Sequence, residues 1–136
     1  SGSLATALIK VKEIMATGKE VPIISANKSL RSALTEMNKK KLGVVCIKEK
    51  SGKINLITDG DVRRNSNNLY KKKIMEVCTK NPTWISENDT ALSAIEKMNS
   101  LKITSLLVAK NKYVNKKIKN VIGILHLHHC LSRGIK

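Results

Sequence analysis

The sequence predicts an α/β fold, of the α+β type, built from two pseudo-symmetric halves. The segment Ile24–Asn38 reappears as Ile85–Asn99 with seven of its fifteen positions identical, and an Ile-Met pair precedes each copy, at Ile14-Met15 and Ile74-Met75. Within each copy, short apolar runs alternate with an amphipathic helical pattern. A duplicated unit of this length is typical of two supersecondary modules that stack on each other.

The first copy predicts the order strand, helix, strand, strand, short helix. Residues 21–25 form the first expected strand, and Ser29 is a suitable N-cap for a helix with a buried apolar stripe of Leu30, Ala33, Leu34 and Met37. Residues 43–47 and 54–58 are apolar runs around a turn that contains Gly52, which predicts a hairpin. Asp59 then starts a short helix, and the polar residues 65–73 are expected to link the halves.

The second copy predicts the same order. Strands are expected at residues 83–86, 104–109 and 121–126, and Thr90 is the expected N-cap of a helix with a buried stripe of Ala91, Ala94, Ile95 and Met98. The hairpin loop of this copy, residues 110–120, is longer than that of the first and rich in lysine. We expect this loop to be mobile surface.

Composition narrows the function. The formal net charge of +16 on 136 residues raises the question of an anionic partner, and the alternative is a solvated lysine-rich surface. The lysines are scattered and aromatic residues are scarce, so we expect no nucleic acid. No apolar run approaches the roughly 18 residues of a membrane span, so we expect no membrane partner and a cytoplasmic protein. Residues 1–3 are interpreted as a remnant of cloning. Cys46, Cys78 and Cys130 are expected to be reduced thiols, with Cys46 in the core.

The duplicated unit, closed in its first copy by Thr58-Asp59-Gly60-Asp61, resembles a tandem pair of CBS domains, or Bateman module, over residues 11–134. Four runs are together similar to the C-terminal regulatory part of bacterial arabinose 5-phosphate isomerases: Val11–Gly18, Ile57–Arg64, Lys102–Val108 and Gly123–His128. The resemblance implies two β-α-β-β-α motifs, at residues 11–68 and 69–136, packed through their sheets.

In that family an N-terminal isomerase domain interconverts ribulose 5-phosphate and arabinose 5-phosphate for Kdo and lipopolysaccharide biosynthesis. The chain holds no such domain, so the resemblance implies a non-catalytic, cytoplasmic module that needs no cofactor. Its implied partners are an attached isomerase domain, a nucleotide-type regulatory ligand such as CMP-Kdo, and a second copy through CBS-pair dimerisation. Two alternatives stay open: a purely structural dimerisation module without ligand, and an adenosine-nucleotide-sensing pair of another enzyme or a transporter.

The resemblance places ligand-binding residues in a cleft between the motifs. Thr58 and Asp61 would hold a ribose, because a carboxylate accepts two hydrogen bonds from a vicinal diol. Arg63 or Arg64 would pair with a phosphate or a sugar-acid carboxylate. The alternative is that Asp59 and Asp61 merely cap the helix and that the arginines are solvated. Under the binding interpretation, Asp61→Ala should abolish most ligand binding and leave the fold intact.

The second copy departs from this pattern, because aligning Thr58 with His126 places His129 opposite Asp61. A neutral imidazole cannot replace a carboxylate that accepts both diol hydrogens. Further ligand candidates at this end are Thr104, Ser105, His126 and His128. For Thr104 and Ser105 the alternative role is strand-edge polarity.

His126 and His128 would share a face if the strand continued through residue 128. We expect them to contact an anionic ligand or the backbone and expect no metal, because the histidine spacing is poor for zinc. Asn55, which matches Gly123 in the second copy, stands where relatives more often have glycine, and it has no functional account.

Overall fold

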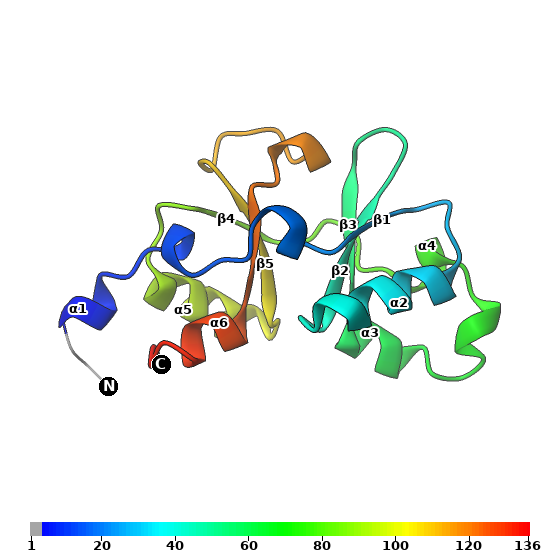
Figure 1. Cartoon of the computed structure of the whole chain (residues 1–136), viewed down its shortest axis with the longest axis horizontal. Coiled ribbons are helices and arrows are strands. Elements are labelled where there is room, and N and C mark those ends of the chain that lie inside the picture. Colours follow the sequence, from blue (N-terminus) through cyan, green and yellow to red (C-terminus); the bar gives the residue numbers. More distant parts are fainter. Residues whose placement is uncertain (1–3) are drawn as a thin grey trace. The chain divides into compact units, whose positions relative to one another are not determined.

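The computed structural model describes residues 4–136, and the remnant predicted at residues 1–3 lies outside them. The chain has an α+β fold with two three-stranded mixed sheets, as predicted (Figure 1). It divides into two compact units. The first-repeat unit comprises residues 19–82 with 116–119, and the second-repeat unit comprises residues 4–18, 83–115 and 120–136. No helix within residues 4–136 is long and apolar enough to cross a membrane.

The first-repeat unit contains a sheet of order β1-β2-β3, in which β1 is parallel and β3 antiparallel to β2. Its strands are β1 (Ile23–Ser25), β2 (Val44–Lys48) and β3 (Ile54–Thr58). Its helices are α2 (Leu30–Lys40), α3 (Asp59–Arg64), the 3-10 helix η3 (Leu69–Lys71) and α4 (Ile74–Val77). Helix α2, cyan in Figure 1, packs against β1 and β2.

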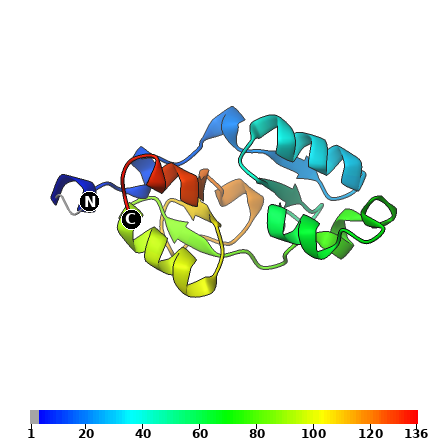
Figure 2. The same ribbon diagram turned by 90° about the horizontal axis from the view of Figure 1, so that it is seen from below.

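The second-repeat unit repeats this arrangement with a sheet of order β4-β5-β6. Its strands are β4 (Trp84–Ser86), β5 (Ser105–Ala109) and β6 (Gly123–His126). Its helices are α1 (Leu4–Ala7), the 3-10 helix η1 (Val11–Glu13), α5 (Ala91–Leu101) and α6 (Leu127–Leu131), and α5 lies beside the strands of its own unit (Figure 2). Two more 3-10 helices, η2 (Gly18–Glu20) and η4 (Ile118–Asn120), lie where the chain passes from one unit to the other.

The long helices begin where the sequence predicts. The side chain of Ser29 accepts a hydrogen bond from the backbone N–H of Ser32 at 3.1 Å, and Thr90 caps α5 through Ser93 at the same distance. All eight residues of the two predicted apolar stripes are buried, which confirms the helical interpretation of the repeat. Each helix ends at a lysine with a left-handed backbone conformation, Lys41 or Lys102.

The segment that precedes each repeat belongs to the other repeat's unit. Ile74 and Val77 of α4 are buried in the core beneath α2. Val11 of η1, with Ile14 and Met15 beside it, packs into the core beneath α5. Each hydrophobic core is therefore completed by residues that the sequence alignment assigns to the neighbouring copy.

The hydrogen bonds of these two segments fix which positions are equivalent. Both η1 and α4 begin with the same cap, in which a glutamate three residues further on accepts a hydrogen bond from the backbone N–H of the N-cap lysine. Both segments then bridge to the third strand of a sheet. The bridges are Ala16–Ile124 and Leu56–Thr79. Met15 is therefore equivalent to Cys78, not to Met75, and the shared Ile-Met pair of the sequence is out of register.

Three expectations about strands and loops need correction. Strand β6 ends at His126, because α6 begins at Leu127 and takes residue 128 into its first turn. The lysine-rich loop is anchored at one end, where Lys117 bridges to Lys53 and the backbone N–H of Ile118 donates to Gly52 O at 2.7 Å. Residues 65–73 do not link the halves, because the first-repeat unit continues to residue 82; they are ordered in part as η3, and Leu69 packs against the core.

The three cysteines are free, as predicted. Cys46 is fully buried on β2, and burial raises the pKa of its thiol to about 12. Burial likewise raises the pKa of Cys130 to about 11. Neither thiol is a nucleophile at neutral pH, because the thiolate is the reactive form.

Candidate functional site

The corner between β3 and α3 is held by reciprocal caps. Thr58 is the N-cap of α3, and its Oγ1 accepts a hydrogen bond from the backbone N–H of Asp61 at 3.2 Å. In return, Asp61 Oδ2 accepts from the backbone N–H of Thr58 at 2.9 Å. This capping box satisfies two backbone donors that the helix leaves unpaired.

The carboxylate of Asp61 is buried, with 4% of the residue exposed, and is surrounded by donors. Thr79 Oγ1 lies 2.8 Å from Oδ1 and 3.0 Å from Oδ2, and Arg64 Nη2 donates to Oδ1 at 2.7 Å. A buried carboxylate requires such partners, because leaving it unpaired costs several kcal/mol. Asp61 therefore caps α3 while it pairs with Arg64, and its ligand-binding role stays a prediction.

These contacts change what Asp61→Ala should do. The substitution removes the cap and leaves the Thr79 hydroxyl without its acceptor, so the fold should lose stability rather than stay intact. The two arginines behave differently from each other. Arg63 is exposed, whereas the guanidinium of Arg64 is held by Asp61 although 67% of its side chain is accessible. Arg63 is the arginine that an incoming anion can contact without breaking an ion pair.

The corner between β6 and α6 has the same backbone design. His126 is the N-cap, and its Nδ1 accepts from the backbone N–H of His128 at 3.0 Å. His129 Nδ1 accepts from the backbone N–H of His126 at 3.0 Å. This confirms the alignment of His126 with Thr58 and of His129 with Asp61.

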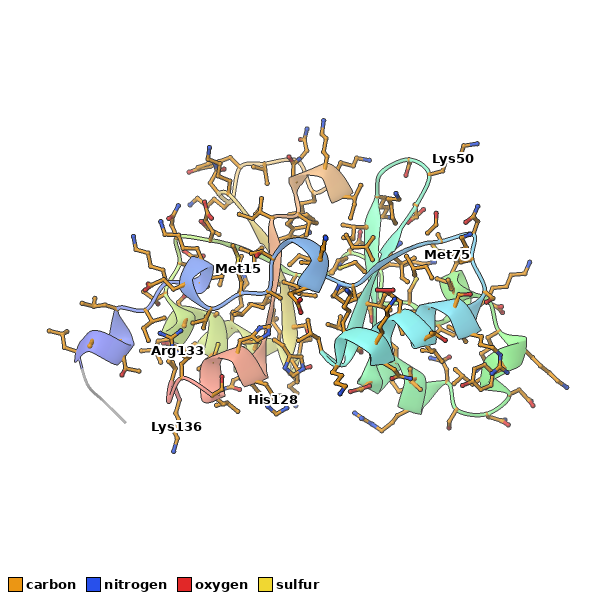
Figure 3. The ribbon with its side chains drawn as sticks, viewed as in Figure 1. Met15, Lys50, Met75, His128, Arg133 and Lys136 are labelled. Atoms are coloured by element: carbon orange, nitrogen blue, oxygen red, sulfur yellow. The ribbon has the colours of Figure 1, made fainter. Side chains whose placement is uncertain are left out.

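The three histidines form one cluster. The rings of His126 and His128 are stacked, with centroids 5.0 Å apart and planes 12° from parallel, and Figure 3 labels His128 at this corner. The two residues therefore meet by stacking across the helix start, not by sharing a strand face. The pKa of His129 is lowered, first by burial and then by the nearby His128. A neutral His129 keeps the lone pair that caps the helix.

Ser105 completes this second corner from the neighbouring strand. It opens β5 and is in register with His126 on β6. Its hydroxyl is buried and has no hydrogen-bond partner, which is uncommon for a buried polar group. Thr104 beside it is exposed, and its backbone oxygen accepts from the N–H of Leu127 at 2.8 Å. Within residues 4–136 no group of three or more metal-ligating side chains has the geometry of an ion site.

Sequence reasoning missed Thr79, which lies eighteen positions from Asp61 in the chain and directly against its carboxylate. The sequence repeat gives no signal for this contact, because the residue equivalent to Thr79 in the register of the bridges is Ala16, which has no hydroxyl. Asn55 also has an account in the structure. Its Nδ2 donates to Glu49 Oε2 at 2.6 Å, while its Oδ1 is buried without a partner.

The chain consists of two β-α-β-β-α units, each with a capped strand-to-helix corner. This architecture defines a tandem-repeat α+β module. The profile of the CBS domain family matches residues 11–68 and 74–135. The chain belongs to this family.

Several relatives match nearly the whole chain. It is 38% identical to the arabinose 5-phosphate isomerase KdsD of Francisella tularensis, covering 100% of this chain and 41% of that protein. It is 36% identical to KdsD of Yersinia pestis, covering 94% of this chain and 38% of that protein. It is 34% identical to the uncharacterized protein RP505 of Rickettsia prowazekii, covering 98% of this chain and 40% of that protein. The chain thus spans about two fifths of the length of these relatives.

Solved structures share the fold at lower identity. The CBS domain pair of protein MJ0100, in complex with 5'-methylthioadenosine and S-adenosyl-L-methionine, has a TM-score of 0.75 and 23% identity, covering 93% of this chain and 94% of that one. CBSX2 in complex with AMP has a TM-score of 0.72 and 18% identity, covering 93% and 96%. At these identities the likeness establishes the fold.

Proposed function

We propose that this chain is the regulatory, non-catalytic module of an arabinose 5-phosphate isomerase and that it senses a nucleotide-type anion. The observation that carries the proposal is the extent of the match to KdsD, which covers 94–100% of this chain at 36–38% identity in two organisms. The larger relatives supply the implied partner, an isomerase domain on the same polypeptide. Kdo and lipopolysaccharide biosynthesis is the pathway that this assignment implies.

The ligand we favour is a nucleotide or nucleotide-sugar such as CMP-Kdo. Two solved CBS pairs of the same fold carry AMP or S-adenosyl-L-methionine, which supports a nucleoside ligand. The net charge of +16 favours a ligand with phosphate and carboxylate groups. As a downstream product, CMP-Kdo would provide feedback by binding one conformation of the module more tightly and shifting the population of the attached enzyme.

At the Thr58 corner we propose that Arg63 makes the first contact with the ligand anion. Arg64 would exchange part of its pairing with Asp61 for the ligand, and Thr58 and Asp61 would face the ribose. At the second corner we propose Thr104, Ser105, His126 and His128 as contacts, because the buried hydroxyl of Ser105 is without a partner. This corner offers imidazoles where the first offers a carboxylate, so the two corners would differ in ligand preference.

A thermal-shift screen at fixed ionic strength tests the proposal, with CMP-Kdo, CMP, AMP, ATP and arabinose 5-phosphate as probes. A saturable stabilisation specific to CMP-Kdo is expected, reaching about 2.7 kcal/mol at a hundredfold excess over Kd. Arg63→Ala should weaken binding, and Lys50→Ala, at an exposed hairpin turn, should leave it unchanged. Stronger shifts with AMP or ATP would favour the adenosine-sensing alternative, and no shift with any probe would favour the structural one.

We also propose that the module forms homo-oligomers, as expected from CBS-pair dimerisation. Light scattering coupled to size exclusion at several protein concentrations tests this directly. A monomer at all concentrations would contradict the dimer and remove the structural alternative with it.

A further inference from the structure

A groove of about 730 Å³ lies within the first-repeat unit, between residues 26–31 and 70–75. Small-molecule sites typically occupy roughly 300–1,000 Å³. The groove begins just after Ser25, where β1 ends, and Ser25 is in register with Lys48 and thereby with Ile54, the first residue of β3. Thr58 closes the other end of β3, so the groove and the Thr58 corner lie at opposite ends of this sheet.

The lining of the groove is cationic and contains no acidic residue. Four of its residues carry positive charge: Lys28, Arg31, Lys72 and Lys73. The guanidinium of Arg31 lies 4.2 Å from the ring centroid of Tyr70, which is also in the lining. This cation–π contact restrains Arg31 while leaving its N–H groups available. Lys72 is restrained as well, because its Nζ donates to Asn65 Oδ1 at 3.3 Å.

The second-repeat unit provides an internal comparison, because its equivalent segments are joined to each other. There the backbone N–H of Val11 donates to Asp89 O at 2.8 Å, that of Lys12 to Glu87 O at 3.0 Å, and that of Ala91 to Ile9 O at 2.8 Å. The equivalent residues also differ in charge. Asp89 stands at the position of Lys28, Glu87 at that of Ala26, and Leu92 at that of Arg31.

In the first-repeat unit this seam is open. Within residues 4–136, no hydrogen bond joins residues 26–31 to residues 70–75. The backbone N–H groups of Leu30, Ile74 and Met75, which are equivalent to the three donors of the closed seam, have no acceptor there. The sequence thus replaces two acidic residues at the seam by a lysine and an alanine, and replaces a closed backbone contact by a cationic groove.

We infer that this groove binds a phosphate-bearing small molecule of the size of a sugar phosphate or nucleoside monophosphate. Above its second pKa a phosphate group has only hydrogen-bond acceptors and no donor. It is therefore bound best by guanidinium, ammonium and unpaired backbone N–H groups. All three kinds of donor line this groove. The apolar side chains of Leu30, Ile74 and Met75 line the rest of it and suit the organic part of such a ligand (Met75 is labelled in Figure 3).

A nitrogen-15 NMR titration of the full chain with inorganic pyrophosphate tests the inference, at an ionic strength of about 0.15 M so that diffuse attraction is screened beyond about 8 Å. We expect saturable shifts of the amide signals of Leu30, Ile74 and Met75. The test variant combines Lys28→Asp with Arg31→Leu, which installs the residues of the closed seam. It should raise the pyrophosphate Kd at least about tenfold, since two charged contacts are lost.

The matched control combines Lys50→Asp with Lys39→Leu. It makes the same change in net charge at two exposed positions outside the lining and should change Kd less than about twofold, because exposed charges beyond a Debye length are screened. Equal losses in the two variants would overturn the inference and leave only general attraction to a basic protein. Amide shifts spread over both units, or none that saturate, would overturn it too. The wild-type shifts decide the matter even if the test variant fails to fold.

Discussion

The corner at Thr58 and the corner at His126 share a backbone design and differ in charge. Each places an acceptor at the N-cap and another at the third helical position, and each thereby satisfies the free N–H groups of a short helix. A carboxylate fills the inner position in one corner and an imidazole in the other. The cap requires only a lone pair, so the surroundings must explain the choice.

The surroundings differ at one residue, which follows α4 in the first-repeat unit and η1 in the second-repeat unit. The hydroxyl of Thr79 donates a hydrogen bond to the carboxylate of Asp61. The equivalent residue in the other unit, Ala16, has no side-chain donor for His129. A buried carboxylate without that donor would be underpaired, and a neutral imidazole does not need it. The identities at the two positions are therefore coupled, and the first corner stores more of its stability in charged hydrogen bonds.

A second contrast lies on the third strands. A Cβ on Gly123 would stand 2.6 Å from Met15 Sδ and 2.7 Å from Ala16 O, so a larger residue fits there only if these atoms shift. In the other unit, Cys78 takes the place of Met15, and Asn55 takes the place of Gly123. A small residue on the strand thus accompanies a large one on the packed segment, and the reverse holds in the other unit.

Asp61→Ala should have the largest effect of the substitutions that test this comparison. The lost cap costs about 1 kcal/mol, and the lost charged hydrogen bonds cost about 2 kcal/mol more, so we expect a loss of about 3 kcal/mol in the free energy of unfolding. Urea denaturation measures it. His129→Ala, at the equivalent position, is the control and should lose only the cap, about 1 kcal/mol. Equal losses would show that the hydrogen bonds from Thr79 and Arg64 add nothing to the first corner.

Gly123→Ala should come next. The added methyl meets a flexible thioether and a rigid backbone oxygen, and overpacking of this kind costs about 2 kcal/mol. Denaturant unfolding again provides the measurement. Adding Met15→Cys, which copies the first-repeat unit, should recover part of the loss because the sulfur contact is relieved. A neutral Gly123→Ala would mean that the segment moves away from β6 without cost.

A smaller effect should follow from pH. Because the pKa of His129 is lowered in the folded protein by burial and by His128, the unfolded chain binds more protons below the ordinary value of 6.5. This contribution to stability is present above that pH and is lost as the pH falls below it. His129→Asn keeps an acceptor but does not titrate, so its unfolding free energy should fall less than that of the wild type between about pH 7 and pH 5. Parallel pH profiles would refute the assignment.

Local features were predictable from the sequence. Ser29 and Thr90 were identified as caps, and both buried stripes followed from helical spacing, because these signals depend on residues within a few positions of each other. The alignment of Asp61 with His129 was also recovered. This alignment depends on the repeat, and the structure confirms it because both residues occupy the third helical position and accept a hydrogen bond from the N-cap backbone N–H.

The long-range contacts were not predictable. The Ile-Met pair suggested one register for the segments ahead of the repeats, whereas their bridges to β3 and β6 set another. The approach of Thr79 to Asp61, and the open seam between residues 26–31 and 70–75, depend on how each segment packs into the other copy's unit. No local periodicity predicts that the segment ahead of one repeat packs into the unit of the other repeat. The helical and strand patterns of both copies would be the same if each segment packed into its own unit.

Ser105→Ala should have the smallest effect on stability and separates structural from ligand-related polarity at the second corner. The hydroxyl is buried without a partner, and the equivalent position in the first-repeat unit is Val44, so its removal should be neutral or stabilising by up to about 1 kcal/mol. Urea unfolding without ligand tests this expectation, and a loss of stability would show that the hydroxyl is paired in solution.

If the group is kept for a ligand, the same variant should bind that ligand several-fold more weakly in a thermal-shift titration while its unfolding in buffer is unchanged. A hydroxyl that costs folding energy and contributes to binding would then mark the second corner as a functional site, whereas unchanged affinity would leave only the first.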